Sequence, residues 1–127
     1  MCAVASSVLI VDDDGRFRAW ARVLLERAGY VVVGEAADGA SAIAAARRDR
    51  PGLVLLDVQL PDVDGFGVAR VLCAERWAPA IVLTSTRDRV DYGERIDDSG
   101  ALGFLPKEQV SGEALADLLA RRDGRMA

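Results

Sequence analysis

Polar side chains that could bind a cation and a phosphate stand at the ends of short apolar segments. Five residues share this position: Asp12, Asp13, Asp57, Thr84 and Lys107. Three carboxylates brought together repel one another, so either their pKa values rise or a cation joins them. With oxygen ligands only and no histidine in the chain, a hard cation is favoured. Mg²⁺ fits best, with Mn²⁺ as the alternative, because it accepts a few carboxylates and keeps water and phosphate oxygens.

A lysine and a hydroxyl would complete a phosphoryl-transfer site. The Lys107 ammonium could neutralise a bound phosphoryl group and Thr84 could donate to it, and positioning with charge neutralisation does most of the catalysis in such sites. Asp57 is then the nucleophile that forms an aspartyl-phosphate. Lys107 is the only lysine among 16 basic residues, and a compact ammonium on a flexible stem is not interchangeable with the planar arginine fork.

Each of these residues alone has an ordinary explanation. An Asp after a strand commonly caps a helix or forms a turn. We interpret Asp14 and Asp38 in this way, and Asp62 as either such a residue or a solvated loop charge. The functional interpretation depends on the polar residues meeting at one edge of a sheet.

The elements that must bring these residues together are five β runs that alternate with five helical runs. The expected strands cover 7–11, 30–34, 53–57, 80–83 and 102–105. The expected helices cover 16–29, 40–48, a segment capped by Asp64, 87–99 and a segment capped by Ser111. This alternation predicts right-handed βαβ units in an α/β fold. We expect a flavodoxin-like, doubly wound, five-stranded parallel sheet of order 2-1-3-4-5, which places the first and third strands side by side.

Length and composition limit the other possibilities. The 127 residues suit one domain, which we place at 7–122, with an N-terminal tail at 1–6 and a C-terminal tail or linker start at 123–127. The net charge of -4 argues against direct nucleic-acid binding. No apolar stretch approaches membrane-spanning length and no signal peptide is evident, so we expect no membrane association and a cytoplasmic protein.

Four segments together resemble the receiver domain of two-component response regulators over about residues 7 to 122. They are VLIVDDD (8–14), LLDVQLPDVDG (55–65), IVLTS (81–85) and GALGFLPK (100–107). The first segment and the GFLPKE stretch are most similar to receivers that are often joined to a C-terminal helix-turn-helix domain. Many receivers follow the lysine with a cis proline. Here Glu108 follows it, so the Lys107–Glu108 geometry stays open.

The resemblance implies a role for each matching position. Asp57 would accept a phosphoryl group from a histidine kinase or phosphotransfer protein. Mg²⁺ would be held by Asp13, Asp57 and the backbone carbonyl of Gln59, with Asp12 acting directly or through water. Lys107 would pair with the phosphoryl oxygens.

The resemblance also implies how the signal leaves the domain. Thr84 would be the switch hydroxyl and Phe104 the coupled aromatic that rotates inward, while Gln59 and Thr86 would tune the phosphate lifetime. The output face would be the fourth helix, fifth strand and fifth helix, which could also form a homodimer and would control a transcriptional output. The 87–99 segment, which holds Gly93, is either a moving element of low stability or simply a short helix. Such a domain catalyses only its own phosphorylation and dephosphorylation.

Two other functional classes remain as alternatives. A pseudo-receiver would be a constitutive interaction or dimerisation domain without phosphorylation, although such domains usually lack part of the acidic and lysine set. A metal-dependent phosphatase typically has a second Asp two residues after its nucleophile, and Gln59 stands there. The DDDGR turn after the first strand lacks the glycine-rich loop of a dinucleotide site.

Overall fold

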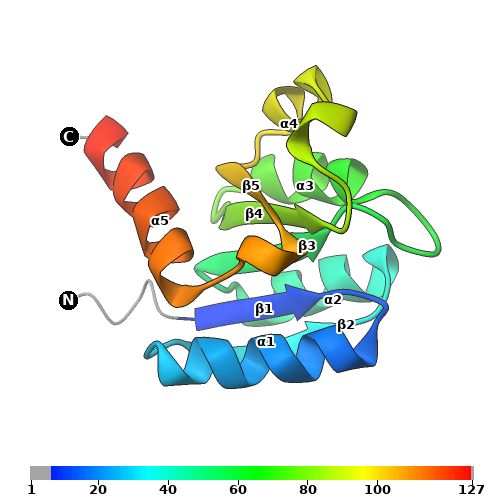
Figure 1. The fold of residues 1–127 in the computed structure, drawn as a ribbon. Coiled ribbons are helices and arrows are strands. Elements are labelled where there is room, and N and C mark those ends of the chain that lie inside the picture. Colours follow the sequence, from blue (N-terminus) through cyan, green and yellow to red (C-terminus); the bar gives the residue numbers. More distant parts are fainter. Residues whose placement is uncertain (1–6, 127) are drawn as a thin grey trace.

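Five parallel strands form one sheet in a computed structural model, which describes residues 7–126 and the side chains of residues 7–121. The strands are β1 (Ser7–Val11), β2 (Val31–Ala36), β3 (Leu53–Asp57), β4 (Ala80–Ser85) and β5 (Gly103–Pro106). Their order is β2-β1-β3-β4-β5, which confirms the predicted flavodoxin-like topology (Figure 1). The expected tail at 1–6 lies outside the described residues.

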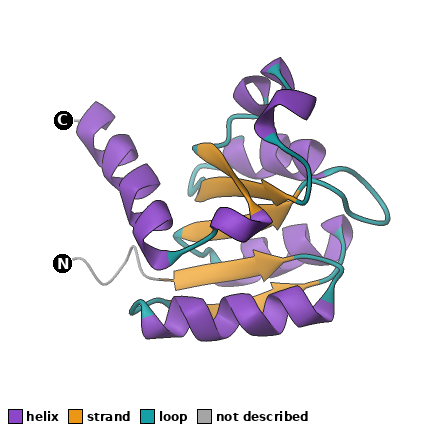
Figure 2. Cartoon of the chain, viewed as in Figure 1, coloured by secondary structure: helices purple, strands orange, loops and turns teal. Residues whose placement is uncertain are grey.

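Helices connect the strands and cover the sheet (Figure 2). They are α1 (Gly15–Arg27), α2 (Gly39–Asp49), α3 (Gly65–Cys73), α4 (Glu94–Asp98) and α5 (Gly112–Met126), with 3-10 turns η2 (Arg89–Asp91) and η3 (Lys107–Gln109). Asp14, Asp38 and Asp64 cap α1, α2 and α3 by accepting from backbone amides, as predicted. The last helix continues to Met126, into the segment 123–127.

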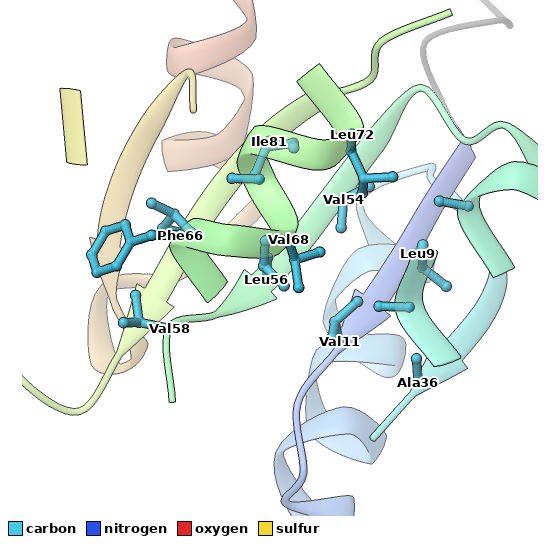
Figure 3. Close-up of a cluster of buried hydrophobic side chains, with 14 of the residues drawn as sticks. Leu9, Val11, Ala36, Val54, Leu56, Val58, Phe66, Val68, Leu72 and Ile81 are labelled. Atoms are coloured by element: carbon cyan, nitrogen blue, oxygen red, sulfur yellow. The ribbon is translucent and has the colours of Figure 1, made fainter. Parts of the chain in front are cut away.

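Two apolar layers lie on opposite faces of the sheet, and alternate residues of each central strand belong to different layers. Val8 and Ile10 of β1 pack in one layer with side chains of α1 and α5. Leu9 and Val11 pack in the other with side chains of α2 and α3 (Figure 3). Every residue of β3 is buried. This two-sided burial explains why the strand is apolar at each position until Asp57.

The segment 87–99 is not one helix, and that prediction was wrong. It divides into η2 and the five-residue α4, with Gly93 between them at a φ of 54°. Asp88 and Asp91 close η2 with reciprocal side-chain to backbone hydrogen bonds. The backbone leaves the helical region at a glycine, which adopts positive φ without a Cβ penalty. The sequence predicts either a moving element of low stability or a short helix here, but it does not predict the point of the break.

The helical spacing of apolar residues predicts that Ile43 and Ala44 of the 40–48 segment and Trp20 of the 16–29 segment face inward, and the structure contradicts the predictions for Ala44 and Trp20. Ala44 of α2 is exposed, whereas Ala42, Ala45 and Ala46 are buried. Ile43 is the single large apolar residue of this alanine-rich helix, so the apolar pattern marks the buried side only loosely. Trp20 of α1 was expected inward but is 46% exposed.

Candidate functional site

The acidic residues come together at the carboxyl edge of β1 and β3. Val11 pairs with Leu56 in the parallel ladder, so the residues that follow, Asp12 and Asp57, lie side by side. One carboxylate oxygen from each of Asp12, Asp13 and Asp57 lies within 4.8 Å of the others. Asp12 and Asp57 are buried while Asp13 is exposed. Three oxygen ligands with one side open to solvent fit a hard divalent cation.

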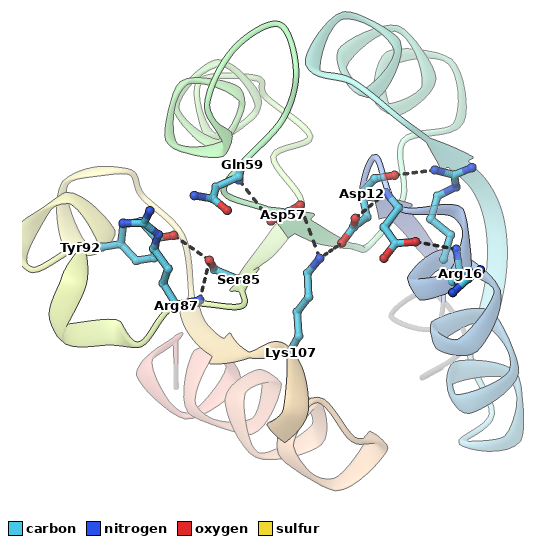
Figure 4. A network of polar contacts seen from close by, with 10 residues as sticks. Asp12, Arg16, Asp57, Gln59, Ser85, Arg87, Tyr92 and Lys107 are labelled. Carbon is cyan, nitrogen blue, oxygen red and sulfur yellow. Dashed lines mark hydrogen bonds and ion pairs between the residues drawn. The ribbon is translucent and has the colours of Figure 1, made fainter.

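Lys107 reaches this cluster from the end of β5 (Figure 4). Its Nζ lies 2.7 Å from Asp12 Oδ2 and 3.6 Å from Asp57 Oδ2. The same Nζ lies 4.7 Å from the centroid of the Phe17 ring. The Lys107–Glu108 peptide bond is trans. Burial alone would lower the pKa of Lys107, but the two carboxylates outweigh it and raise that pKa, so the ammonium stays charged.

The electrostatics of Asp57 differ from those of a surface carboxyl. Burial, followed by the charge of Asp12, raises the pKa of Asp57 from 3.8 to about 6. Lys107 opposes this rise, as does the Gln59 N–H, which donates to Asp57 Oδ1 at 3.2 Å. A nucleophile or metal ligand must be an ionised carboxylate. Without a further cation, the surroundings of Asp57 disfavour this ionised form.

Thr84 sits on the neighbouring strand, where β4 pairs it with Asp57. The side chain is buried, and among the described residues its Oγ1 has no hydrogen-bond partner. A buried polar group left unpaired costs free energy. Thr84 is therefore free to bond to an added oxygen at this edge.

Phe104 and the residues around it form an aromatic stack next to this edge. The Phe104 ring is buried, with 6% exposure. The Tyr92 ring lies between those of Phe104 and Phe66, at centroid distances of 5.7 and 5.4 Å. The Tyr92 hydroxyl and Ser85 Oγ share a 2.7 Å hydrogen bond (Figure 4). Phe104 is therefore held in a packed position in this structure, whereas Gln59 and Thr86 are exposed.

Two positioning residues escaped the sequence reasoning. Arg18 Nη1 donates to the Asp12 carbonyl at 2.6 Å, and its Nε pairs with Glu35 at 3.0 Å, which fixes the acidic loop against β2. A Cβ at Gly65 would overlap the Asp57 carbonyl oxygen and lie 2.9 Å from the Val58 Cα. The sequence predicts that Asp64 caps a helix, but only the fold shows that Gly65 lies against the backbone of Asp57.

Comparison with known proteins identifies relatives of this arrangement. The family model described as "Response regulator receiver domain" matches residues 8–120. The transcriptional regulatory protein PdtaR of Mycobacterium tuberculosis is 40% identical over 105 residues, 83% of this chain and 51% of PdtaR. The DNA-binding response regulator MtrA of Mycobacterium bovis is 36% identical over 123 residues, 95% of this chain and 52% of MtrA. The chain spans about half the length of these curated relatives.

Solved structures agree with the fold. The receiver domain of NarL from Mycobacterium tuberculosis has a TM-score of 0.81 at 31% identity, covering 94% of this chain and 97% of that chain. A LuxR-family two-component response regulator from Aurantimonas sp. SI85-9A1 has a TM-score of 0.82 at 28% identity, covering 93% of this chain and 85% of the other.

Among the described residues, no helix has the length and apolar character needed to cross a bilayer.

Proposed function

Because this chain belongs to the response regulator receiver domain family, we propose that it is a phosphorylation switch in two-component signalling and that Asp57 is its phosphoacceptor. One observation carries the proposal. Lys107 Nζ lies between the buried carboxylates of Asp12 and Asp57, beside a third carboxylate. This arrangement presents a nucleophile, a metal-binding cluster and a counter-charge at one edge of the sheet.

The phosphoryl group comes from a phosphohistidine on a histidine kinase or phosphotransfer protein. The Asp57 carboxylate oxygen attacks phosphorus, a P–O bond forms, and the P–N bond to the histidine breaks, with the leaving electron pair kept by the imidazole nitrogen. Asp13, Asp57 and the Gln59 backbone carbonyl would hold Mg²⁺, with Asp12 acting directly or through water. When bound, the cation would neutralise charge on the phosphoryl oxygens.

The protein's own groups stabilise the product. Lys107, 3.6 Å from Asp57 Oδ2, pairs with a phosphoryl oxygen. The unpartnered hydroxyl of Thr84 donates to another. Gln59 and Thr86, both exposed at this edge, control the approach of the water that hydrolyses the acyl phosphate.

The response spreads from Thr84 to the face formed by α4, β5 and α5. Movement of Thr84 toward the phosphate changes the packing of Phe104 and of Tyr92, which stacks on it. The altered face controls a partner or an attached output domain, or forms a homodimer. The names of PdtaR and MtrA, a transcriptional regulatory protein and a DNA-binding response regulator, support a transcriptional output in a longer protein.

Intact-mass spectrometry tests this function. The protein is incubated with acetyl phosphate, a small acyl-phosphate donor, with Mg²⁺ or with EDTA, beside Asp57→Asn and the control Asp14→Asn, which alters the exposed cap of α1. We expect one added phosphoryl group in the wild type and in Asp14→Asn with Mg²⁺ only, and none in Asp57→Asn. If the wild type gains no group and binds no beryllium fluoride, the chain is a pseudo-receiver.

A further inference from the structure

The loop between β3 and α3, residues 58–64, is attached to a helix that precedes it in the chain. Asp62 Oδ1 accepts from the Gly39 N–H at 2.8 Å and Oδ2 accepts from the Ala40 N–H at 3.0 Å. These are the first amides of α2, which no intrahelical carbonyl can satisfy. The cap residue of α2, Asp38, accepts instead from the Ser41 N–H at 2.7 Å. Two carboxylates therefore share the N-terminus of this helix, and one of them comes from the loop.

The contact is close as well as polar. A Cβ at Gly39 would overlap Val63 Cγ2 and would lie 3.1 Å from Val68 Cγ2. Glycine at this position lets the tip of the loop lie directly on the α2 backbone. The same amides lower the pKa of Asp62, so the carboxylate stays ionised and its attraction to the helix N-terminus is kept.

Both ends of the loop are fixed at the acidic cluster. The Gln59 N–H donates to Asp57 Oδ1 at 3.2 Å, and the Gly65 N–H donates to the Val58 carbonyl at 2.7 Å. Gln59 also forms an isolated bridge with Asp64. The backbone from Asp57 to Gly65 is thus a closed turn, with Gln59 at its base and with its tip, at Asp62 and Val63, lying on α2.

We propose that Asp62 is a positioning residue, which fastens the tip of the 58–64 loop to α2 and so holds the Gln59 backbone beside Asp57 before any cation binds. The effect of Asp62 on metal binding rests on the proposed function, because that function assigns the Gln59 carbonyl to Mg²⁺. Asp62 touches neither the cation nor the phosphoryl group. It acts through the conformation of the loop.

The chain offers a matched control for this role. Asp62→Ala and Asp38→Ala each remove a carboxylate from the N-terminus of α2, but only Asp62 belongs to the loop. Mg²⁺ affinity is measured by isothermal titration calorimetry, and hydrogen exchange of the Gln59 amide is measured by NMR in the metal-free protein. For Asp62→Ala we expect about tenfold weaker Mg²⁺ binding, typical of lost groups that orient metal ligands, and faster Gln59 exchange. Asp38→Ala should keep both values near wild type, and Asp62→Asn, which retains one acceptor oxygen, should be intermediate.

Two results would overturn the proposal. The first is an Asp62→Ala variant whose Gln59 exchange rate and Mg²⁺ affinity equal those of the wild type. The second is an Asp38→Ala variant that loses as much Mg²⁺ affinity as Asp62→Ala, because the effect would then come from the stability of α2 alone. A wild-type protein that binds no Mg²⁺ would contradict the proposed function instead. In that case the Gln59 exchange rates of the metal-free variants still decide whether Asp62 holds the loop.

Discussion

Replacing Asp57 by asparagine should stabilise the metal-free protein at neutral pH. The pKa of Asp57 is raised from 3.8 to about 6, mainly by burial and by the charge of Asp12. The folded state therefore favours the neutral form, and above pH 6 it carries a carboxylate in surroundings that disfavour the charge. The asparagine side chain of the Asp57→Asn variant has nearly the same shape and no charge.

The magnitude follows from the pKa difference. A rise of about two pK units, at about 1.4 kcal/mol each, makes the ionised side chain cost about 3 kcal/mol of folding free energy. Lys107 then loses one of its two carboxylate partners but keeps Asp12, at 2.7 Å. We therefore expect the free energy of unfolding of Asp57→Asn to exceed that of the wild type by about 1–3 kcal/mol at pH 7.5.

The sign of the pH dependence is a stricter test. Because the folded pKa lies above the unfolded one, the contribution of Asp57 to stability is complete below pH 3.8 and is lost as the pH rises through about 6. The advantage of Asp57→Asn should therefore vanish at pH 4. The contributions of carboxyls that do not interact with Asp57 are the same in both proteins and cancel in the difference.

Urea denaturation with EDTA, followed by circular dichroism at pH 4 and 7.5, measures these differences. The control is Asp13→Asn, which removes an exposed carboxylate from the same cluster and should stabilise less. Added Mg²⁺ should stabilise the wild type by mass action and so reduce the difference in unfolding free energy between Asp57→Asn and the wild type. If Asp57→Asn is no more stable than the wild type at pH 7.5, or if its advantage persists at pH 4, burial does not strain this carboxylate and the reasoning is refuted.

Three further outcomes follow from the site. Gly65→Ala should lower the free energy of unfolding, measured by urea denaturation, by about 1–3 kcal/mol, because its Cβ would overlap the Asp57 carbonyl. The control Gly67→Ala, whose Cβ would lie 3.6 Å from its nearest neighbour, should leave that free energy unchanged. Lys107→Met should lower the free energy of unfolding by about 3 kcal/mol, because two buried carboxylates lose their cation. If Lys107→Met lowers the free energy of unfolding equally in the Asp57→Asn background, that cause is contradicted. Mg²⁺ affinity, measured by calorimetry, should fall as the pH drops below about 6, where protons compete for Asp57; constant affinity between pH 7.5 and 5 would contradict the raised pKa.

The sheet was predictable because short local sequence patterns indicate its strands. An apolar run such as Leu53–Leu56, followed by Asp57, indicates a strand buried on both sides that ends at the edge of the sheet. The alternation of such runs with amphipathic segments fixes a parallel sheet. The convergence of Asp12, Asp57, Thr84 and Lys107 then follows from topology, because parallel strands end at one edge.

The parts that sequence could not supply depend on contacts between distant segments. Asp62 could be a helix cap or a solvated loop charge, and nothing near it in the chain indicates that it binds the α2 amides at Gly39 and Ala40. Arg18 likewise contacts the Asp12 carbonyl only because α1 folds back along β2. The interruption at Gly93 lies next to Tyr92, whose ring packs between those of Phe66 and Phe104, and no local helix pattern indicates that contact.

Reductive trapping of the phosphorylated residue is the most direct test of the central claim. The wild-type protein is incubated with Mg²⁺ and acetyl phosphate, and borohydride then reduces the acyl phosphate of the modified aspartate to a homoserine side chain. Peptide mass spectrometry reads the position. We expect homoserine in place of Asp57 and of no other aspartate. Homoserine in place of Asp12 or Asp13, or none anywhere while the protein takes up phosphate, would contradict the assignment of Asp57 as the phosphoacceptor.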